Sequence, residues 1–509
     1  MLFNSYVFIC LFLPLTVVLF HLLRRRGLER GSILLLTLAS LTFYGWWSAQ
    51  YLLLLIPLML IDFVIASRMV RLRRQKRTGI KLLLILGVCI NLGALGYYKY
   101  ANFFVDNANT LFNTELFLAT IVLPIGISFF TFQKIAFLID VYYGKVERFN
   151  LLDYSLFVTF FPQLIAGPIV HHSEMMPQFS KLGRIEAGYI ALGLTIFSIG
   201  LAKKVLLADS AAAYASPQFD AAAAGASLDL LAAWSGALAY TVQLYFDFSA
   251  YSDMAMGIGL LFGIRLPLNF ASPYKANSII DFWRRWHMTL SRFLRDYLYI
   301  PLGGNRKGRG RRFINLFLTM LLGGIWHGAG WTFAIWGALH GVYLIINHGW
   351  RELRRRLGLS VEAHSFWGRK LAQLITFLAV VVAWVFFRAA DVDSAMGILS
   401  AMAGNNGIAA PASLAQYAPE LPVSHSPVDS GMGLLVAGAL LLLAWLAPNT
   451  QQLTAYAGPE GACGSGEAEP VSARLGWNSS RGWAFYAAVL LTISFMLMSR
   501  VSEFIYFQF

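Results

Sequence analysis

The chain has 509 residues, of which 58% are hydrophobic and only 13% are charged, and its mean hydropathy is +0.60. Soluble domains carry about 25% charged residues, so this composition excludes a soluble enzyme, a disordered chain and a coiled coil, and it leaves a polytopic membrane protein. The net charge of +14 indicates basic cytoplasmic loops rather than nucleic-acid binding.

The first apolar run covers residues 6–23 and is followed by Arg24, Arg25 and Arg26. A cleavable secretion signal carries its positive charge before the apolar run, so we expect a first transmembrane helix with its N-terminus outside the cytoplasm. Of the 40 Lys and Arg residues, 26 fall in four segments, residues 24–30, 68–81, 284–312 and 351–370. The positive-inside rule predicts that these four segments are cytoplasmic.

Apolar runs continue along the chain. They cover residues 33–47, 51–65, 80–97, 116–139, 151–165, 190–207, 232–246, 254–266, 313–325, 332–346, 374–387, 433–446 and 484–498. Runs 151–165, 254–266 and 313–325 are too short to cross a bilayer core of about 30 Å, which predicts re-entrant or half-helices. The sequence therefore predicts an all-α polytopic membrane protein with about 11 to 13 helices at membrane depth.

No separate soluble domain is indicated, so we expect one integral membrane domain over residues 1–509. Residues 405–430 and 447–483 are rich in Ala, Gly, Pro and Ser and are predicted to be polar, partly flexible loops, with disorder at 458–469. The three cysteines, Cys10, Cys89 and Cys463, suggest neither a disulfide framework nor a Cys-based metal site.

Three of the nine histidines lie in or beside apolar runs. His327 and His340 belong to the stretch 313–346, which contains no charged residue, and His287 directly precedes most of the basic segment 284–312. A buried neutral imidazole can accept a proton from a hydroxyl that attacks an acyl carbonyl. A histidine that merely hydrogen-bonds between helices is the alternative for each of them.

Other polar positions favour structural interpretations. His171 and His172 have only Glu174 nearby, so a polar loop is favoured over a metal site, and no metal is expected. Asp247 and Asp253 lie in an apolar context, and we expect them to pair with Arg284 or Arg285. Asn305 follows two glycines in a turn that either receives an anionic donor or is an ordinary basic loop.

Several blocks resemble the membrane-bound O-acyltransferase family, and most closely its bacterial branch that contains the alginate O-acetyltransferase membrane subunit. The most specific are Phe282-Trp283-Arg284-Arg285-Trp286-His287, the block 294–305 ending in Gly303-Gly304-Asn305, and the block 323–341 with its Trp326-His327-Gly328 motif. The apolar runs 33–47 and 51–65 are joined by a very short link and are expected to form a helical hairpin. Its tip, Tyr44-Gly45-Trp46-Trp47, and the C-terminal residues 506–509 are also similar to this branch.

The resemblance implies a ring of tilted helices around a central funnel and assigns site residues. His327 matches the catalytic histidine and would act as general base, His287 would orient the donor carbonyl or bind the acceptor, and His340 has a less defined role. The funnel walls would be Trp283, Trp286, Trp326 and Trp331. The residues expected on the donor side are Asn305, Arg284, Arg285, Arg292, Arg295 and Arg306.

The implied function is O-acetylation of a bacterial exopolysaccharide, alginate being favoured over cellulose or another glycan. No bound cofactor is expected; acetyl coenzyme A or another acyl thioester would be the donor substrate. The implied location is the bacterial inner membrane, with periplasmic acetyltransferases of the SGNH type and a carrier of the acyl group as partners. A polysaccharide transporter or flippase subunit is the rival hypothesis, although a transporter would more often show inverted repeats and buried coupling carboxylates.

Overall fold

The computed structural model describes all residues except 166, 183–184, 361–364, 460–475 and 499–509. The described residues form helices and no strand, apart from one isolated parallel bridge between Ala410 and Val423. Most of the segment predicted to be disordered, 458–469, and the C-terminal residues 506–509 lie outside the described residues.

The elements follow one another in four groups. The first group is η1 (Phe8–Phe12), α1 (Leu13–Arg25), α2 (Glu29–Gly45), α3 (Gln50–Arg74), α4 (Ile80–Leu95), η2 (Gly96–Tyr100), α5 (Ala101–Phe112) and α6 (Ile127–Tyr142). The second is α7 (Leu151–Thr159), α8 (Phe161–Leu164), α9 (His172–Lys181), α10 (Ala187–Ala202), η3 (Lys203–Ala208), α11 (Asp209–Ala223) and α12 (Leu230–Leu261).

The third group is η4 (Pro273–Lys275), α13 (Ile279–Arg285), α14 (Met288–Leu294), η5 (Arg295–Tyr299), α15 (Arg309–His327), α16 (Trp331–Arg356) and α17 (Phe366–Arg388). The fourth is α18 (Val392–Met402), η6 (Ala412–Tyr417), α19 (Ser430–Leu446), α20 (Thr450–Thr454) and α21 (Arg481–Leu497). Elements η1, η2, η3 and η5 are π-helical, whereas η4 and η6 are 3-10 helices.

Five helical segments of the described chain are long and apolar enough to cross a membrane. They are Phe8–Arg25, Gln50–Arg74, Ile80–Phe112, Ala187–Ala223 and Phe366–Arg388. Shorter apolar helices are Val392–Met402, Ser430–Leu446 and Arg481–Leu497. The all-α, polytopic membrane class predicted from composition is confirmed, whereas the ring around a funnel stays a prediction.

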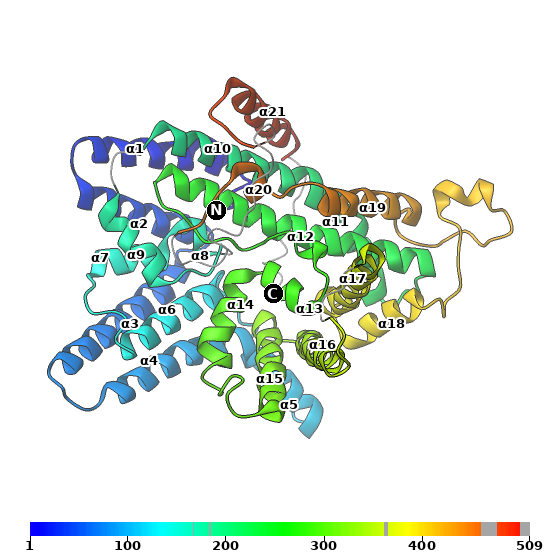
Figure 1. The fold of residues 1–509 in the computed structure, drawn as a ribbon, viewed down its shortest axis with the longest axis horizontal. Coiled ribbons are helices and arrows are strands. Elements are labelled where there is room, and N and C mark those ends of the chain that lie inside the picture. Colours follow the sequence, from blue (N-terminus) through cyan, green and yellow to red (C-terminus); the bar gives the residue numbers. More distant parts are fainter. Residues whose placement is uncertain (166, 183–184, 361–364, 460–475, 499–509) are drawn as a thin grey trace.

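Helix α12 corrects one prediction. The runs 232–246 and 254–266 are not separate pieces, because α12 continues for 32 residues, from Leu230 to Leu261, and crosses the middle of the molecule (Figure 1). The carboxylate of Asp229 begins the helix by accepting hydrogen bonds from the backbone N–H groups of Leu231 and Ala232. The run 116–139 is likewise helical only from Ile127 onward.

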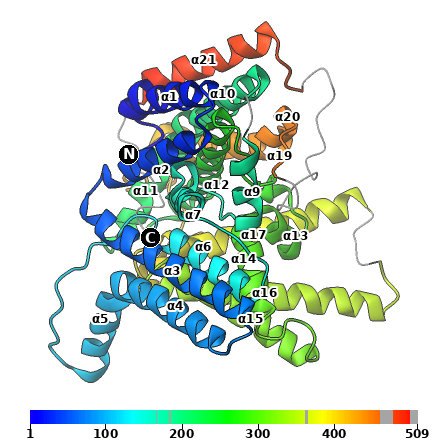
Figure 2. The ribbon, with the colours of Figure 1, turned by 90° about the vertical axis from the view of Figure 1, so that its left-hand side faces the viewer.

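Two hydrophobic clusters make up the core, and α12 contributes to both. One cluster takes the part of α12 from Tyr251 onward together with Trp326, and the other takes the part up to Phe248 together with Trp336 and Phe387. Figures 1 and 2 show α15 and α16 on the opposite side of α12 from α1, α10 and α21. The end of α15 therefore lies where the two clusters meet.

Candidate active site

The α15–α16 hairpin holds the candidate site, and glycines let its two helices touch backbone to backbone. A Cβ atom added to Gly324 would lie 2.4 Å from the carbonyl oxygen of Phe333, and one added to Gly337 would lie 2.5 Å from that of Met320. Small residues at such crossings permit close helix packing in membranes. The hairpin therefore fixes the position of the C-terminal end of α15, where His327 is the last helical residue.

His327 is 7% exposed and is surrounded by aromatic rings. Its ring centroid lies 4.9 Å from that of Trp326 and 5.1 Å from those of Trp336 and Phe387. No hydrogen bond from elsewhere in the described part of the chain reaches its ring nitrogens. The imidazole thus packs among aromatic rings, and its nitrogens are not engaged by the described residues.

His340 lies in α16, one ring away from His327. Its centroid is 4.8 Å from that of Trp336, which also contacts His327. Trp283 donates its indole N–H to Nδ1 of His340 over 3.3 Å, and within the described residues Nε2 of this fully buried ring has no partner. His340 therefore packs against Trp336, which in turn packs against His327.

His287 precedes α14 in a left-handed conformation with φ 42°, which is uncommon for a residue with a side chain. Its Nδ1 lies 3.1 Å from Oδ1 of Asn269, and its ring packs 4.7 Å from that of Phe248. The rings of Phe270, Trp286 and Phe282 connect His287 to His340, and Trp336 connects His340 to His327. The structure thus brings the three predicted histidines into one region.

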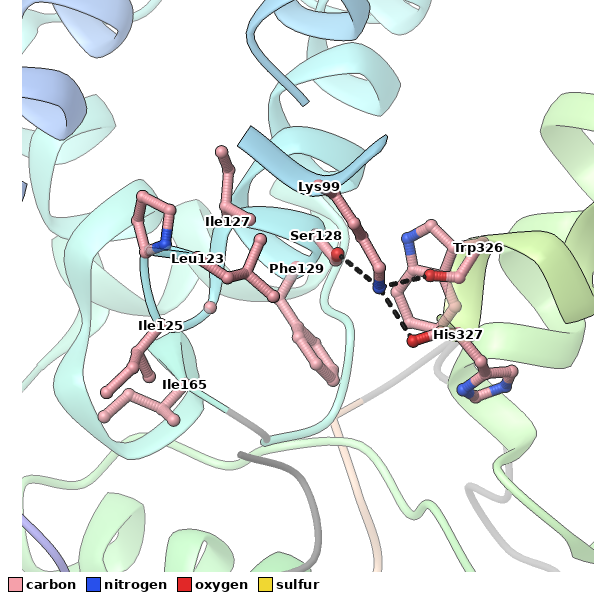
Figure 3. Close-up of a pocket in the computed structure, with 11 residues that line it drawn as sticks. Lys99, Leu123, Ile125, Ile127, Ser128, Phe129, Ile165, Trp326 and His327 are labelled. Carbon is pink, nitrogen blue, oxygen red and sulfur yellow. Dashed lines mark hydrogen bonds between the residues drawn. The ribbon is translucent and has the colours of Figure 1, made fainter. Parts of the chain in front are cut away.

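A small pocket opens beside the end of α15 at His327 (Figure 3). It is lined by Lys99, residues 123–129, Ile165, Trp326 and His327. Lys99 donates hydrogen bonds to the carbonyl oxygens of Trp326 and His327, while the imidazole of His327 points away from the ammonium group (Figure 3). Lys99 was not predicted from the sequence, since the apolar run 80–97 ends before it, although a lysine within the helical segment Ile80–Phe112 is the kind of intramembrane charge that signals function.

The predicted tryptophans do not all lie at the pocket. Trp326 lines it, and Trp286 is buried against Trp384 with 4.9 Å between ring centroids. Trp283 contacts His340, as described above. Trp331 is 60% exposed and donates its indole N–H to Asn107 over 2.9 Å, so it is not one of the buried aromatic rings around His327 and His340.

The predicted donor-side residues are spread along α13, α14 and the loop that follows. Arg284, Asn305 and Arg306 are exposed. Three other arginines form ion pairs with neighbouring carboxylates, Arg285 with Asp281, Arg292 with Glu174, and Arg295 with Asp296. Among these predicted residues, the exposed arginines without a described ion pair are therefore Arg284 on α13 and Arg306 on the loop, whereas Arg292 and Arg295 are paired.

The expected pairing of Asp247 and Asp253 with Arg284 or Arg285 is wrong. Lys204 lies 2.7 Å from Asp247, and Lys203 lies 2.8 Å from Asp253. Both lysines belong to η3, which packs against α12, whereas Arg285 pairs with an aspartate on its own helix. The nearest sequence run of basic residues was thus a poor guide to the buried partners.

His171 and His172 belong to a hydrogen-bonded cluster around Asp140. Oδ2 of Asp140 lies 3.3 Å from Nδ1 of His172 and accepts a hydrogen bond from Tyr297 over 2.8 Å. Burial alone would raise the pKa of Asp140, but the nearby His172 imidazole and hydrogen bonds from Lys145 and Tyr297 outweigh it and hold the pKa at about 2. The described residues contain no group of His, Cys, Asp or Glu that could hold a metal ion.

Residues 144–387 match the model of a family described as MBOAT, the membrane-bound O-acyltransferase family. The matched segment contains all three histidines of the candidate site. A polytopic helical protein with this match is a membrane enzyme that transfers acyl groups.

Similar proteins with named activities extend the match beyond that segment. The chain is 46% identical over 438 residues to a peptidoglycan O-acetyltransferase of Helicobacter pylori, covering 80% of this chain and 81% of that protein. It is also 46% identical over 411 residues to a probable alginate O-acetylase AlgI of Pseudomonas aeruginosa, covering 79% and 75%. A teichoic acid D-alanyltransferase of Streptococcus thermophilus is 27% identical over 52% of this chain and 68% of that protein. The chain therefore belongs to the membrane-bound O-acyltransferase family, which confirms the resemblance stated from its motifs.

Proposed function

We propose that the chain transfers an acetyl group from a cytoplasmic thioester donor, across the bacterial inner membrane, for O-acetylation of a cell-envelope polysaccharide. The observation that carries this proposal is the position of His327. Its imidazole ends α15 among aromatic rings, beside a pocket, with no hydrogen bond to its ring nitrogens from the described residues. A base whose ring nitrogens are not engaged by the described residues can act on a substrate hydroxyl that reaches them.

The chemistry follows from the properties of a buried imidazole. A ring nitrogen of His327 takes the proton of the acceptor hydroxyl while its oxygen attacks the thioester carbonyl. The new C–O bond forms, the C–S bond breaks, and the departing thiolate takes the proton back from the imidazolium. His287, fixed by Asn269, is suited to orient the donor carbonyl or the acceptor near this centre.

The donor side is assigned by charge. The four basic segments favour the cytoplasm, which puts the loop containing Arg306 on that side and the N-terminus of the chain in the periplasm. An acyl thioester with phosphate groups, such as acetyl coenzyme A, or an acylated carrier would be attracted to this loop. The acetyl group would then pass to periplasmic SGNH-type acetyltransferases acting on the polymer.

The relatives support two candidates for the polymer. An alginate-type exopolysaccharide is the first, in keeping with the motifs and with the relative named alginate O-acetylase. Peptidoglycan is the second, because the relative named peptidoglycan O-acetyltransferase is equally identical and is matched over a larger share of its length. Both polymers offer sugar hydroxyls to the periplasmic acetyltransferases, so the proposed step at His327 is the same for either.

The test replaces His327 with Ala in cells whose only copy of the gene carries the change. Ester-linked acetate is measured separately in the exopolysaccharide and the peptidoglycan, per chain inserted in the membrane. We expect it to fall about 10²- to 10⁴-fold in one fraction, because the general base is lost. His21→Gln is the control, since His21 lies in α1 and its ring contacts the carbonyl of Leu261 instead of the pocket.

The outcomes separate the hypotheses. Acetate that persists at the normal level in both fractions of the inserted His327→Ala variant rejects the acyltransferase role of this histidine. Loss of acetate with continued export of the polymer rejects the transporter alternative. The fraction that loses its acetate identifies the polymer.

A further inference from the structure

Two neighbouring side chains from the π-helical turn η2 reach the end of α15. Lys99 donates through its Nζ to the carbonyl oxygens of Trp326 at 2.6 Å and of His327 at 2.7 Å, and it lies 3.4 Å from Oγ of Ser128 (Figure 3). The hydroxyl of Tyr100 donates to the carbonyl oxygen of Ile325 over 2.7 Å. The last three residues of α15 are thus held from outside the helix by residues more than 200 positions away in sequence.

The backbone at this point needs such partners. An α-helix leaves its last four carbonyl oxygens without partners in the helix, and these groups carry the negative end of its dipole. α15 stops at His327 because Gly328 is extended, with φ −157° and ψ 154°. A lysine ammonium satisfies two of these carbonyls at once and also complements the dipole.

Lys99 differs from three other buried or half-buried lysines, Lys134, Lys203 and Lys204, in what it faces. Lys134, Lys203 and Lys204 each lie within 3.2 Å of a carboxylate oxygen. The partners of Lys99 among the described residues are neutral oxygens, two of which belong to the end of α15. Removing an ammonium group from water costs free energy. If Lys99 served packing alone, a carboxylate partner would offset more of this free energy than neutral oxygens do.

The local geometry of η2 is a second observation. Regular α-helical geometry changes to π-helical at Gly96–Tyr100, between α4 and α5. Such insertions occur frequently at functional sites. Here the insertion lies where Lys99 and Tyr100, which are adjacent in sequence, both reach carbonyls of the same helix end.

We propose that Lys99, assisted by Tyr100, is a positioning residue that fixes the last turn of α15 and so holds the imidazole of His327 in its reactive orientation. This inference rests on the proposed role of His327 as the base. Lys99 acts through the backbone, because its ammonium group binds the carbonyl of His327 while the ring points to the other side (Figure 3). Within the described residues the ring packs against Trp326, Trp336 and Phe387 and receives no hydrogen bond, so its direction depends on the backbone that carries it.

The test compares Lys99→Met, which keeps the aliphatic stem, with Lys99→Arg, which keeps a cation and its donors. Ester acetate per inserted chain is measured in cells as for His327. We expect Lys99→Met to lower the rate about 10- to 100-fold, the size of effect expected when a catalytic group is displaced by about 1 Å. Lys99→Arg is expected to recover most of the rate, and Tyr100→Phe to lose less than Lys99→Met.

Lys203→Met is the matched control. Lys203 also lies in a π-helical turn, its Nζ is 5.9 Å from the ring centroid of Tyr245, and the Nζ of Lys99 is 5.9 Å from that of Trp326. Its partner is Asp253 on α12, away from the pocket. We expect Lys203→Met to reduce the amount of inserted protein but to leave the rate per inserted chain within about 3-fold.

A second readout is independent of substrate. Purified variants are treated with diethyl pyrocarbonate, and the rate of modification of each histidine is followed by mass spectrometry. Lys99→Met is expected to change the rate at His327 several-fold and to leave His21 unchanged. Equal rates at His327 in Lys99→Met and the unaltered chain, or equal activity losses in Lys99→Met and Lys203→Met, would overturn the inference. Retained activity of His327→Ala would instead remove the proposed function on which it rests.

Discussion

Two buried polar regions of the molecule differ in how their polar side chains are paired. Where η3 packs against α12, the Nζ atom of Lys204 lies 2.8 Å from Asp209 and 2.7 Å from Asp247. The carboxylate of Asp253 pairs with Lys203 and accepts hydrogen bonds from Thr450 and Gln451. Near the end of α15, the imidazole of His327 has aromatic neighbours and a pocket but no hydrogen bond from the described residues.

The difference indicates what each region does. Charges that are fully paired inside a membrane protein stabilise one packing arrangement and have no remaining capacity for a ligand. A polar ring whose nitrogens make no hydrogen bond to the described residues keeps the capacity to exchange a proton or form a hydrogen bond with a substrate. We therefore distinguish two kinds of buried polarity, a structural kind at α12 and, under the proposed function, a chemical kind at the end of α15.

The largest expected effect on stability comes from Lys204→Met. The change leaves Asp247 and Asp209 buried or half-buried without their shared cation, which we expect to cost about 3–5 kcal/mol. Thermal unfolding of the purified chain in lipid nanodiscs measures this loss. The double variant Lys204→Met with Asp247→Asn is expected to recover part of it. Normal stability of the single variant would contradict the structural interpretation of this network.

A smaller effect is expected from Gly337→Ala in α16. The added Cβ would meet the carbonyl oxygen of Met320 on α15 at 2.5 Å, so the two helices must separate, at about 1–3 kcal/mol. Since this contact sets the position of the α15 end, ester acetate per inserted chain should fall as well. Gly349→Ala in the same helix, where a Cβ has nothing within 4 Å, should leave both quantities unchanged or improve stability.

His340→Phe tests whether His340 belongs to the structural kind. Phenylalanine preserves an aromatic ring between Trp336 and Trp283 but leaves the indole N–H of Trp283 without its acceptor, at about 1–3 kcal/mol. We expect the rate per inserted chain to fall less than about 10-fold, far less than for His327→Ala. A loss as large as that of His327→Ala would move His340 into the chemical kind.

The sequence was sufficient for the class of fold and for the histidines. Composition determines that a chain with 13% charged residues must be embedded in a membrane. A histidine in or beside an uncharged stretch can be recognised from the sequence alone, and His327, His340 and His287 lie in one region of the structure. That they perform the proposed chemistry stays a prediction until the variants are measured.

The pairings could not be predicted, because they join elements that are distant along the chain. Lys203 and Lys204 lie in η3, 43 or more positions before Asp247, and nothing in the local pattern selects them over Arg284 or Arg285. Lys99 was missed for the same reason, since its partners are the backbone oxygens of residues 326 and 327. Apolar runs also failed to delimit α12, since its polar residues around Asp247 and Asp253 are satisfied by buried lysines rather than ending the helix.

The smallest effect is expected at the loop before α15. Arg306 and Lys307 are exposed, in contrast to Arg292, which already pairs with Glu174, so the loop can attract an anionic donor without disturbing the buried site. With acetyl coenzyme A as the probe, Arg306→Gln with Lys307→Gln should raise the apparent KM about 2- to 5-fold and leave kcat unchanged, because steering alters encounter rather than chemistry. The difference should vanish near 0.5 M salt, where the Debye length is only about 4–5 Å. Arg77→Gln with Lys81→Gln, which removes two exposed charges from another basic segment, is the control; an equal change there would assign the effect to net charge rather than to this loop.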